Sequence, residues 1–275
     1  MKDAFGNYVV QKIFEIGAET QRHELRQIIQ TEFMELSMHK YGCRVLQAVF
    51  EKSAVHQQIF IITLVFPDDF VELSKNDNGN HVMQQLFRCE PLNVKDYLFD
   101  KVKNDIFELS LDPYGSHVIQ YILANGSPTH RSEIFKCISR NADKLLKLIQ
   151  DCYGNYVIQH AVQYCAQTDK DNLMWFIVEG VTALAQDKYA SNVVERTLKY
   201  AAPDMKKQAL RIICNQRPDM DAYANFVVQK LVVDSEDVVM LAYLYRRIRP
   251  NLGEIRRHTG GRNIIDKLEQ KLRHA

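Results

Sequence analysis

Polar and apolar positions along the chain follow the spacing of amphipathic helices, most plainly in its first stretch, Phe5–Phe14. When these residues are placed about 100° apart, as in an α-helix, three fall on one arc: Asn7, Tyr8 and Gln11. Three apolar residues fall on the opposite side: Val9, Val10 and Ile13. The pattern predicts a helix with one face packed inward and a polar face presented outward.

The same ten-residue phrase recurs along the chain with the same division between its faces. The seven copies are FGNYVVQKIF, YGCRVLQAVF, NGNHVMQQLF, YGSHVIQYIL, YGNYVIQHAV, YASNVVERTL and YANFVVQKLV. Their third residues, separated by 36, 37, 36, 39, 36 and 34 positions, are Asn7, Cys43, Asn80, Ser116, Asn155, Ser191 and Asn225. A fixed period of about 20–50 residues is typical of a solenoid built from stacked repeats.

Each period predicts further helices before the phrase. For the period that ends at Phe87, the expected helices are His56–Phe66, Phe70–Leu73 and Gly79–Arg88. Pro67 should end the first, because proline lacks an amide hydrogen and clashes inside a helix, and Asp68 and Asp69 should cap the second. The polar segment Ser74–Gly79 should form a turn. Few stretches alternate with a period of two, so we expect no strands.

These elements predict an all-α fold: a crescent-shaped α-solenoid of seven three-helix repeats and a C-terminal capping unit. We expect a single domain over residues 1–275, because stacked repeats share one continuous core. Residues 246–275 contain a degenerate copy, with Gly261, Arg262 and Asn263 in the phrase position and Asp266 in place of Gln. Terminal repeats usually cover the end of the core, so this segment is interpreted as a cap that does not bind ligand.

Composition narrows the possible functions. The chain has 275 residues, 46% hydrophobic and 25% charged, which is ordinary for a folded protein. Its net charge is +1, so a nucleic-acid site would need local placement of Lys and Arg. The six cysteines lack metal-ligand spacing and fit reduced thiols. The longest apolar run, about Ile59–Phe66, is too short to cross a bilayer, and the chain does not open on a signal peptide.

Three positions of the phrase, which we call the triplet, vary together from copy to copy. The first holds Asn, Ser or Cys, the middle one is mostly aromatic, His or Arg, and the last holds Gln or Glu. The triplets are Asn7/Tyr8/Gln11, Cys43/Arg44/Gln47, Asn80/His81/Gln84, Ser116/His117/Gln120, Asn155/Tyr156/Gln159, Ser191/Asn192/Glu195 and Asn225/Phe226/Gln229. A solvated face would explain any single copy, but it would drift freely among Lys, Glu, Ser and Thr. Seven coordinated copies therefore indicate a binding surface.

The chemistry of the triplet suits nucleobases. Flat middle side chains can stack on a base, with a contribution of about 1–3 kcal/mol per base. Two amides match the acceptor–donor–acceptor edge of uracil, and a carboxylate accepts both donors of guanine. One Gln amide can satisfy adenine, and a small Cys or Ser leaves room for the larger purine. The variation therefore predicts base discrimination.

In these phrases and in the tail RPNL, nearly the whole chain resembles the Pumilio homology (PUF) repeats of RNA-binding proteins. The resemblance implies Pumilio-type three-helix repeats that each bind one base. In the family, Asn with Gln reads U, Cys or Ser with Gln reads A, and Ser with Glu reads G, on RNA that runs antiparallel to the chain. The first and last triplet residues would then contact base edges, and the middle ones would stack on the bases. The implied target is 5′-UGUAUAU-3′. Asn192 is a weak stacker, and Ser116/His117 departs from the more familiar Cys/Arg pair.

The resemblance also implies partners and a cellular role. We expect binding to 3′ untranslated regions of messenger RNA, and repression of translation or promotion of decay through corepressors or deadenylase machinery on the convex face. We expect a cytoplasmic monomer with no membrane association, no cofactor, no metal and no enzymatic activity. The family has eight repeats and these resemble its second to eighth, so the first is expected to be missing. A partner-binding loop of relatives corresponds to the short segment Asn215–Tyr223.

Two other functions remain open at this stage. An armadillo- or HEAT-like solenoid could bind extended peptides, but that groove gives no reason for Glu195 to occur only with Ser191. An enzyme built on a helical array would need a metal, phosphate or triad motif, which this sequence does not offer. Lys12, Arg196 and Lys230 follow the last triplet residue, and they either offset phosphate charge or belong to the solvated surface.

Overall fold

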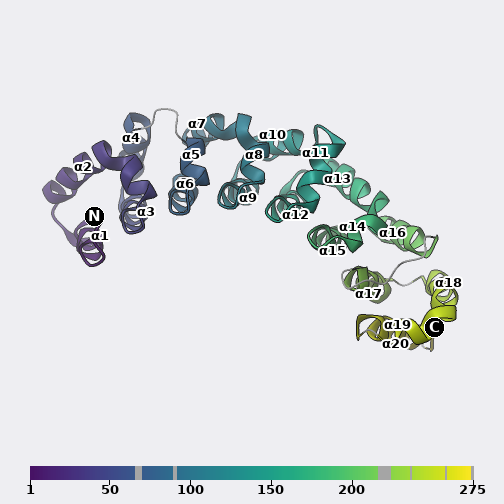
Figure 1. Cartoon of the computed structure of the whole chain (residues 1–275). Coiled ribbons are helices and arrows are strands. Elements are labelled where there is room, and N and C mark those ends of the chain that lie inside the picture. Colours follow the sequence, from purple (N-terminus) through teal and green to yellow (C-terminus); the bar gives the residue numbers. More distant parts are fainter. Residues whose placement is uncertain (66–69, 89–91, 216–223, 236, 258, 274–275) are drawn as a thin grey trace. The chain divides into compact units, whose positions relative to one another are not determined.

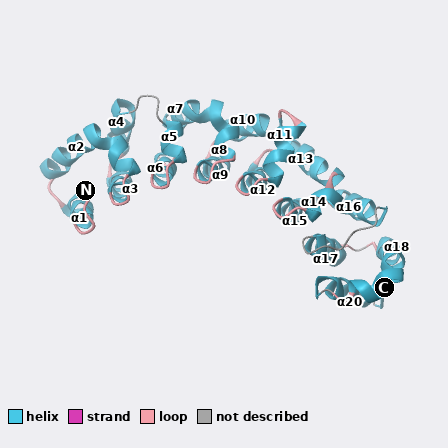
Figure 2. Ribbon diagram, in the orientation of Figure 1, coloured by secondary structure: helices cyan, strands magenta, loops and turns pink. Residues whose placement is uncertain are grey.

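A computed structural model describes residues 1–65, 70–88, 92–215, 224–235, 237–257 and 259–273 (Figure 1). Every regular element among these residues is a helix, and none is a strand (Figure 2). The predicted all-α class is confirmed. The chain divides into two compact units, Met1–Arg140 and Asn141–Ala275, which are described separately. A single domain over residues 1–275 stays a prediction.

In the first unit, the phrases form helices that pack one on the next, α1 on α3, α3 on α6 and α6 on α9. These phrase helices are α1 (Gly6–Ile16), α3 (Gly42–Lys52), α6 (Gly79–Leu86) and α9 (Gly115–Asn125). The remaining helices are α2 (Glu19–Met38), α4 (Val55–Val65), α5 (Phe70–Lys75), α7 (Leu92–Val102), the 3-10 turn η1 (Lys103–Asp105), α8 (Ile106–Ser110) and α10 (Pro128–Ser139). They form a second layer behind the phrase helices, where α2 packs on α4 and α5 on α7 (Figure 1).

The second unit repeats this arrangement, with α12 packed on α15, α15 on α17 and α17 on α20. These helices are α12 (Gly154–Tyr164), α15 (Ala190–Tyr200), α17 (Ala224–Asp234) and α20 (Thr259–Arg273). Behind them lie α11 (Ala142–Gln150), α13 (Gln167–Glu179), α14 (Val181–Gln186), α16 (Pro203–Asn215), α18 (Val238–Ile248), the 3-10 turn η2 (Arg249–Asn251) and α19 (Leu252–Ile255). The degenerate copy thus forms α20, which packs on the last phrase helix, α17, and its role as a cap stays a prediction.

The predicted helices of the third period match α4, α5 and α6 to within two residues at every end. Pro67, Asp68 and Asp69 lie outside the described residues, so their predicted roles are not tested. The second period differs, because the expected short helix before the phrase is continuous with the long one in α2. No proline or glycine interrupts Glu19–Met38, so nothing in that segment breaks the helix.

A valine two residues after the first triplet position forms the core between successive phrase helices. Six copies are fully buried: Val45, Val82, Val118, Val157, Val193 and Val227. The seventh copy, Val9 on α1, was also expected to pack inward, but it is 61% exposed. Among the described helices, α1 packs on one phrase helix, α3, and the side that carries Val9 is exposed.

The glycine of the phrase permits a close helix approach. A Cβ atom on Gly79 would lie 2.5 Å from the carbonyl oxygen of Leu73, and one on Gly154 would lie 2.7 Å from that of Leu148. Both distances are below normal van der Waals contact, so the starts of α6 and α12 rest directly on the ends of α5 and α11. No described glycine has a positive φ angle, so close approach, not backbone conformation, explains the glycine.

Candidate nucleic-acid interface

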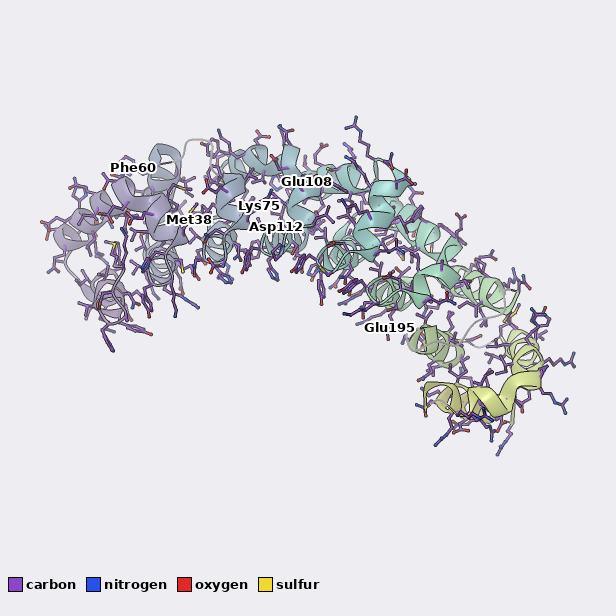
Figure 3. The ribbon with its side chains drawn as sticks, viewed as in Figure 1. Met38, Phe60, Lys75, Glu108, Asp112 and Glu195 are labelled. Carbon is purple, nitrogen blue, oxygen red and sulfur yellow. The ribbon has the colours of Figure 1, made fainter. Side chains whose placement is uncertain are left out.

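The triplets lie at the start of the phrase helices, and we call the surface that they form the triplet face. It consists of two parts, on α1, α3, α6 and α9 in the first unit and on α12 and α15 in the second. Glu195 projects from this face on α15, whereas Phe60 lies on α4, in the layer behind the phrase helices of the first unit (Figure 3). The side chains of Asn225 and Phe226 are outside the described residues.

In the six phrases whose preceding turn the structure describes, a capping residue organises the turn into the helix. It stands four positions before the first triplet residue, and its side chain accepts hydrogen bonds from two backbone N–H groups of the turn. The capping residues are Asp3, His39, Asn76, Asp112, Asp151 and Asp187. Such side chains satisfy the N–H groups that lack partners at a helix start. The sequence analysis missed this role, although an Asp, Asn or His recurs at that spacing.

In five of the six described triplets the first residue is buried beneath the triplet face, and does not stand on it as the helical projection suggested; Ser191 is only partly buried. Asn7, Cys43, Asn80, Ser116 and Asn155 are at most 2% exposed. Each asparagine folds back on its turn, where its Nδ2 donates to two backbone carbonyls at 2.8–3.0 Å. The projection treats the helix in isolation and therefore omits the carbonyls of the preceding turn, which attract this side chain.

The last triplet residue depends on the first for its orientation. In the three asparagine triplets, the Gln Nε2 donates to the Asn Oδ1: Gln11 to Asn7 at 2.9 Å, Gln84 to Asn80 at 3.2 Å and Gln159 to Asn155 at 3.0 Å. In the cysteine triplet, Gln47 donates to the backbone oxygen of Cys43 at 3.1 Å. Gln120, beside Ser116, has a buried Nε2 without a hydrogen-bond partner. The first residue therefore changes how the Gln amide is held.

The two remaining triplets have partners of other kinds. Ser191 donates to the backbone oxygen of Lys188 at 3.2 Å, while Glu195 is exposed on the next turn of α15. Gln229, from the seventh phrase, donates to the backbone oxygen of Gly260 in α20 at 3.4 Å. The capping helix therefore holds the last described Gln of the series.

The middle triplet residue is exposed in all six described triplets: Tyr8, Arg44, His81, His117, Tyr156 and Asn192. In the first unit, neighbouring members act on one another. Burial, followed by the positive charges of Arg44 and His117, lowers the pKa of His81, against an opposing effect of Asp77. The neutral imidazole is therefore favoured there, and the middle residues of adjacent helices lie close enough to sense each other's charge.

The three basic residues after the triplets already have partners within the chain. Lys12 pairs with Glu15 at 2.9 Å, Lys230 pairs with Asp234 at 3.3 Å, and Arg196 donates to Gln163 at 3.4 Å. The two lysines are exposed enough for solvent to weaken these ion pairs. Both interpretations, phosphate contact and solvated surface, remain compatible with this geometry.

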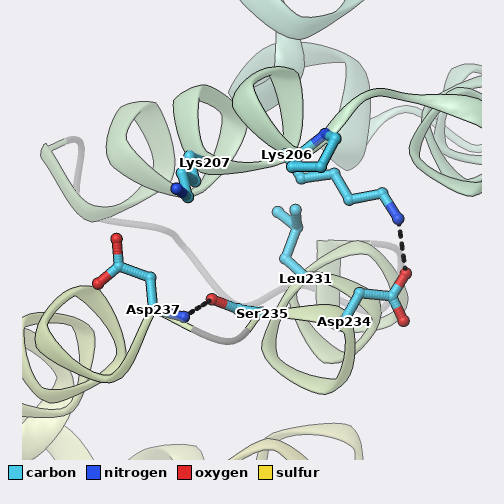
Figure 4. A pocket seen from close by; sticks show the side chains of 7 residues that line it. Lys206, Lys207, Leu231, Asp234, Ser235 and Asp237 are labelled. Atoms are coloured by element: carbon cyan, nitrogen blue, oxygen red, sulfur yellow. Dashed lines mark hydrogen bonds and ion pairs between the residues drawn. The ribbon is translucent and has the colours of Figure 1, made fainter.

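A separate pocket of about 500 Å³ lies between α16 and α17 (Figure 4). Its lining includes Lys206, Asp234 and Asp237 but no triplet residue. Lys206 pairs with Asp234 at 3.4 Å.

Within the described parts of the chain, no cluster of His, Cys, Asp and Glu could hold a metal ion, and no helix is long and apolar enough to span a membrane. The triplet face is therefore the best-supported candidate site.

The fold and the repeated triplets define a helical repeat protein with one equivalent polar site per repeat. The model of the Pumilio-family RNA binding repeat matches residues 1–29, 32–65, 69–103, 105–139, 144–177 and 181–214. The chain belongs to this family, which is non-enzymatic.

Known relatives agree with this membership. The chain is 30% identical to a Pumilio domain-containing protein of Schizosaccharomyces pombe and 30% identical to Pumilio homolog 12 of Arabidopsis thaliana, over 98% of its own length in both cases. It spans only 40% and 46% of those proteins. Among solved structures, it is similar to PUF-8 in complex with PBE-RNA, with a TM-score of 0.85, 30% identity and coverage of 98% of this chain and 80% of that one. The Puf3 RNA binding domain bound to a Cox17 RNA 3′ UTR site gives a TM-score of 0.81, 29% identity and coverage of 98% and 82%.

Proposed function

We propose that the chain binds single-stranded RNA sequence-specifically through the triplet face, with one base per repeat. The observation that carries this proposal is the recurrence of an exposed middle side chain beside a Gln or Glu in every described triplet. Flat exposed groups spaced one per repeat suit successive stacked bases. The amides and the one carboxylate beside them suit hydrogen bonding to base edges. Two similar solved structures are RNA complexes, which supports the same ligand class.

The proposed target is 5′-UGUAUAU-3′, read from the last phrase to the first. Uracils are assigned to the Asn/Gln triplets, adenines to Ser116/Gln120 and Cys43/Gln47, and the guanine to Ser191/Glu195. The anchoring of Gln in the asparagine triplets supports a distinct specificity there, because it restricts the directions in which the amide can donate and accept. Gln120 lacks this anchor, because its Nε2 has no hydrogen-bond partner in the chain, and this difference between the two kinds of triplet supports assigning them different bases.

The wider cellular role is proposed from the family. The protein would bind 3′ untranslated regions of messenger RNA in the cytoplasm as a monomer, and recruit corepressors or deadenylase machinery that repress translation or promote decay. The chain spans less than half of the length of two curated relatives, so this wider role is proposed for the protein and not for the triplet face alone.

Fluorescence anisotropy with labelled UGUAUAU tests the binding proposal at one fixed salt concentration. Tyr156→Ala removes a stacking side chain that is 52% exposed, and Tyr243→Ala on α18 is the matched control, at 42% exposed and outside the triplet face. We expect Tyr156→Ala to weaken binding about 5- to 100-fold, in line with the loss of one stacked base, and Tyr243→Ala to leave it unchanged. Equal losses in both variants, or equal binding to an unrelated RNA of the same length, would contradict the proposal.

A further inference from the structure

The turn before α3 is capped by a different chemical group from the other described turns. Nδ1 of His39 accepts hydrogen bonds from the backbone N–H groups of Tyr41 at 3.2 Å and Gly42 at 3.3 Å. In the five other turns, a carboxylate or amide oxygen accepts the equivalent bonds at 2.6–2.9 Å. Only an unprotonated ring nitrogen can accept a hydrogen bond, so this geometry requires a neutral imidazole with its proton on Nε2.

Protonation would abolish this cap. The imidazolium carries a proton on both ring nitrogens and can only donate, so the N–H groups of Tyr41 and Gly42 would lose their acceptor and face a positive charge. Imidazoles ordinarily titrate near pH 6.5, about 2 units or more above carboxylates, and an amide such as that of Asn76 does not titrate in this range. Among the described turns, the one before α3 is thus the only one whose capping acceptor is an imidazole nitrogen.

This turn supports the second triplet directly. The backbone N–H of Cys43 donates to the carbonyl of His39 at 2.9 Å, and the Cys43 thiol lies 3.4 Å from the carbonyl oxygen of Lys40. Gln47 then bonds the backbone oxygen of Cys43. From the following turn, Asn78 donates to the carbonyl of Met38 at 3.2 Å. The last residue of this triplet is thus connected to His39 by two successive hydrogen bonds.

We propose that His39 is a positioning residue for the Cys43/Arg44/Gln47 triplet, and that its protonation loosens this triplet and weakens RNA binding at that repeat. The proposal rests on the proposed function. Charged groups surround the turn on several sides. Lys40 and Arg44 belong to the same segment, and Asp77 acts on the Cys43 thiol from the next turn.

The other nearby charges come from the adjoining helices. Glu35 lies one helical turn before His39 on α2 and is paired with Lys2 at 2.5 Å, and His81 on α6 senses Arg44. Because charges of both signs lie near the turn, the effect of His39 must be isolated by substitution.

His39→Asn provides that comparison, because Asn76 caps the equivalent turn of the next repeat with an amide oxygen. Hydrogen exchange is measured at about pH 7.5 and about pH 5.5, on either side of the usual imidazole range, and is expressed as protection factors for the amides of Tyr41 and Gly42. We expect both factors to fall about fivefold on acidification in the parent chain, as expected for loss of a cap. They should stay constant in His39→Asn, and His39→Asp serves as a second variant if the first folds poorly.

The RNA arm measures the affinity for UGUAUAU at the same two pH values. The parent should lose several-fold more affinity on acidification than His39→Asn, since every other titratable group is present in both chains. Identical pH responses of parent and variant, in either exchange or binding, would overturn the proposal. If neither chain binds any RNA at either pH, the proposed function itself fails, and the exchange data then show only whether His39 stabilises the turn.

Discussion

The side-chain amide of Gln159 donates a 3.0 Å hydrogen bond to Oδ1 of Asn155, whose own Nδ2 is held by the carbonyls of Asp151 and Cys152. A long, flexible side chain on the triplet face is thereby tied to the backbone of the turn beneath it. The same bonds recur around Asn7 and Asn80. Orienting the Gln in advance reduces the side-chain entropy lost on binding.

Removal of this buried asparagine should destabilise the fold. Asn155→Ala loses three hydrogen bonds in a site that is 1% exposed, so we expect the free energy of unfolding to fall by about 1–3 kcal/mol. Urea denaturation followed by circular dichroism measures the change. Asn192→Ala is the control, because Asn192 is exposed and makes only long contacts of 3.3 and 3.4 Å. A loss within about 0.5 kcal/mol for both variants would show that the buried bonds contribute little.

The close approach at the phrase glycine predicts a sharp difference between two Gly→Ala substitutions. In Gly79→Ala the new methyl group would lie 2.5 Å from the Leu73 carbonyl oxygen and 2.6 Å from its Cδ1. Helix α6 must then move away from α5, at a cost of about 1–3 kcal/mol. In Gly6→Ala the nearest atoms belong to the Asp3 side chain at 3.3 Å, and little change is expected. Equal thermal shifts would refute this packing explanation.

Acidification should reduce stability through His160 as well as His81. Burial lowers the pKa of His160, and Arg196 acts in the same direction, while the Tyr156 carbonyl opposes them. The unfolded chain therefore binds the proton more readily, so stability is unaffected above about pH 6.5 and falls as the pH drops toward the lower folded-state pKa. His160→Gln should shrink the loss of unfolding free energy between about pH 7.5 and pH 5.5. An unchanged loss would mean that His160 does not contribute.

Thiol chemistry offers an independent check on burial. Burial raises the pKa of Cys214 to about 11 and also raises that of Cys43, the buried first residue of the second triplet. The thiolate is the reactive form, so iodoacetamide near pH 8 should modify Cys214 at least about 100-fold more slowly than the partly exposed Cys152. Peptide mass spectrometry resolves the sites. If Cys214 is modified as fast as Cys152, the thiol of Cys214 is not buried.

The helical repeats were predictable from the sequence, because the apolar positions within each ten-residue phrase mark the buried side of its helix. Residues such as Val82 and Val118 are buried where the period places them, and the exposed Tyr156 stands where the helical projection put it. The burial of Asn155 was not predictable from the projection, since it depends on backbone carbonyls in the turn. The continuous helix Glu19–Met38 was also missed, because similarity to the other periods suggested a break that its own residues do not impose.

The capping residues could have been found from the sequence. Asp112, Asp151 and Asp187 stand at a constant distance before the phrase, which is a recognisable helix-start pattern. His39, which occupies this position where the other described turns have Asp or Asn, would then have stood out as chemically different. The orphaned amide of Gln120, in contrast, follows from three-dimensional burial, which no local pattern specifies.

The central claim is that each triplet selects one base, and the Ser191/Glu195 triplet tests it most directly. Affinities for UGUAUAU and for UUUAUAU would be measured at fixed salt for the parent chain and for the double variant Ser191→Asn with Glu195→Gln. The account predicts that the parent prefers the RNA with G by about 10-fold or more, in the range of one bidentate base contact, and that the double variant prefers U. If neither chain distinguishes the two RNAs, the triplets do not read bases, and a peptide-binding solenoid becomes the better account.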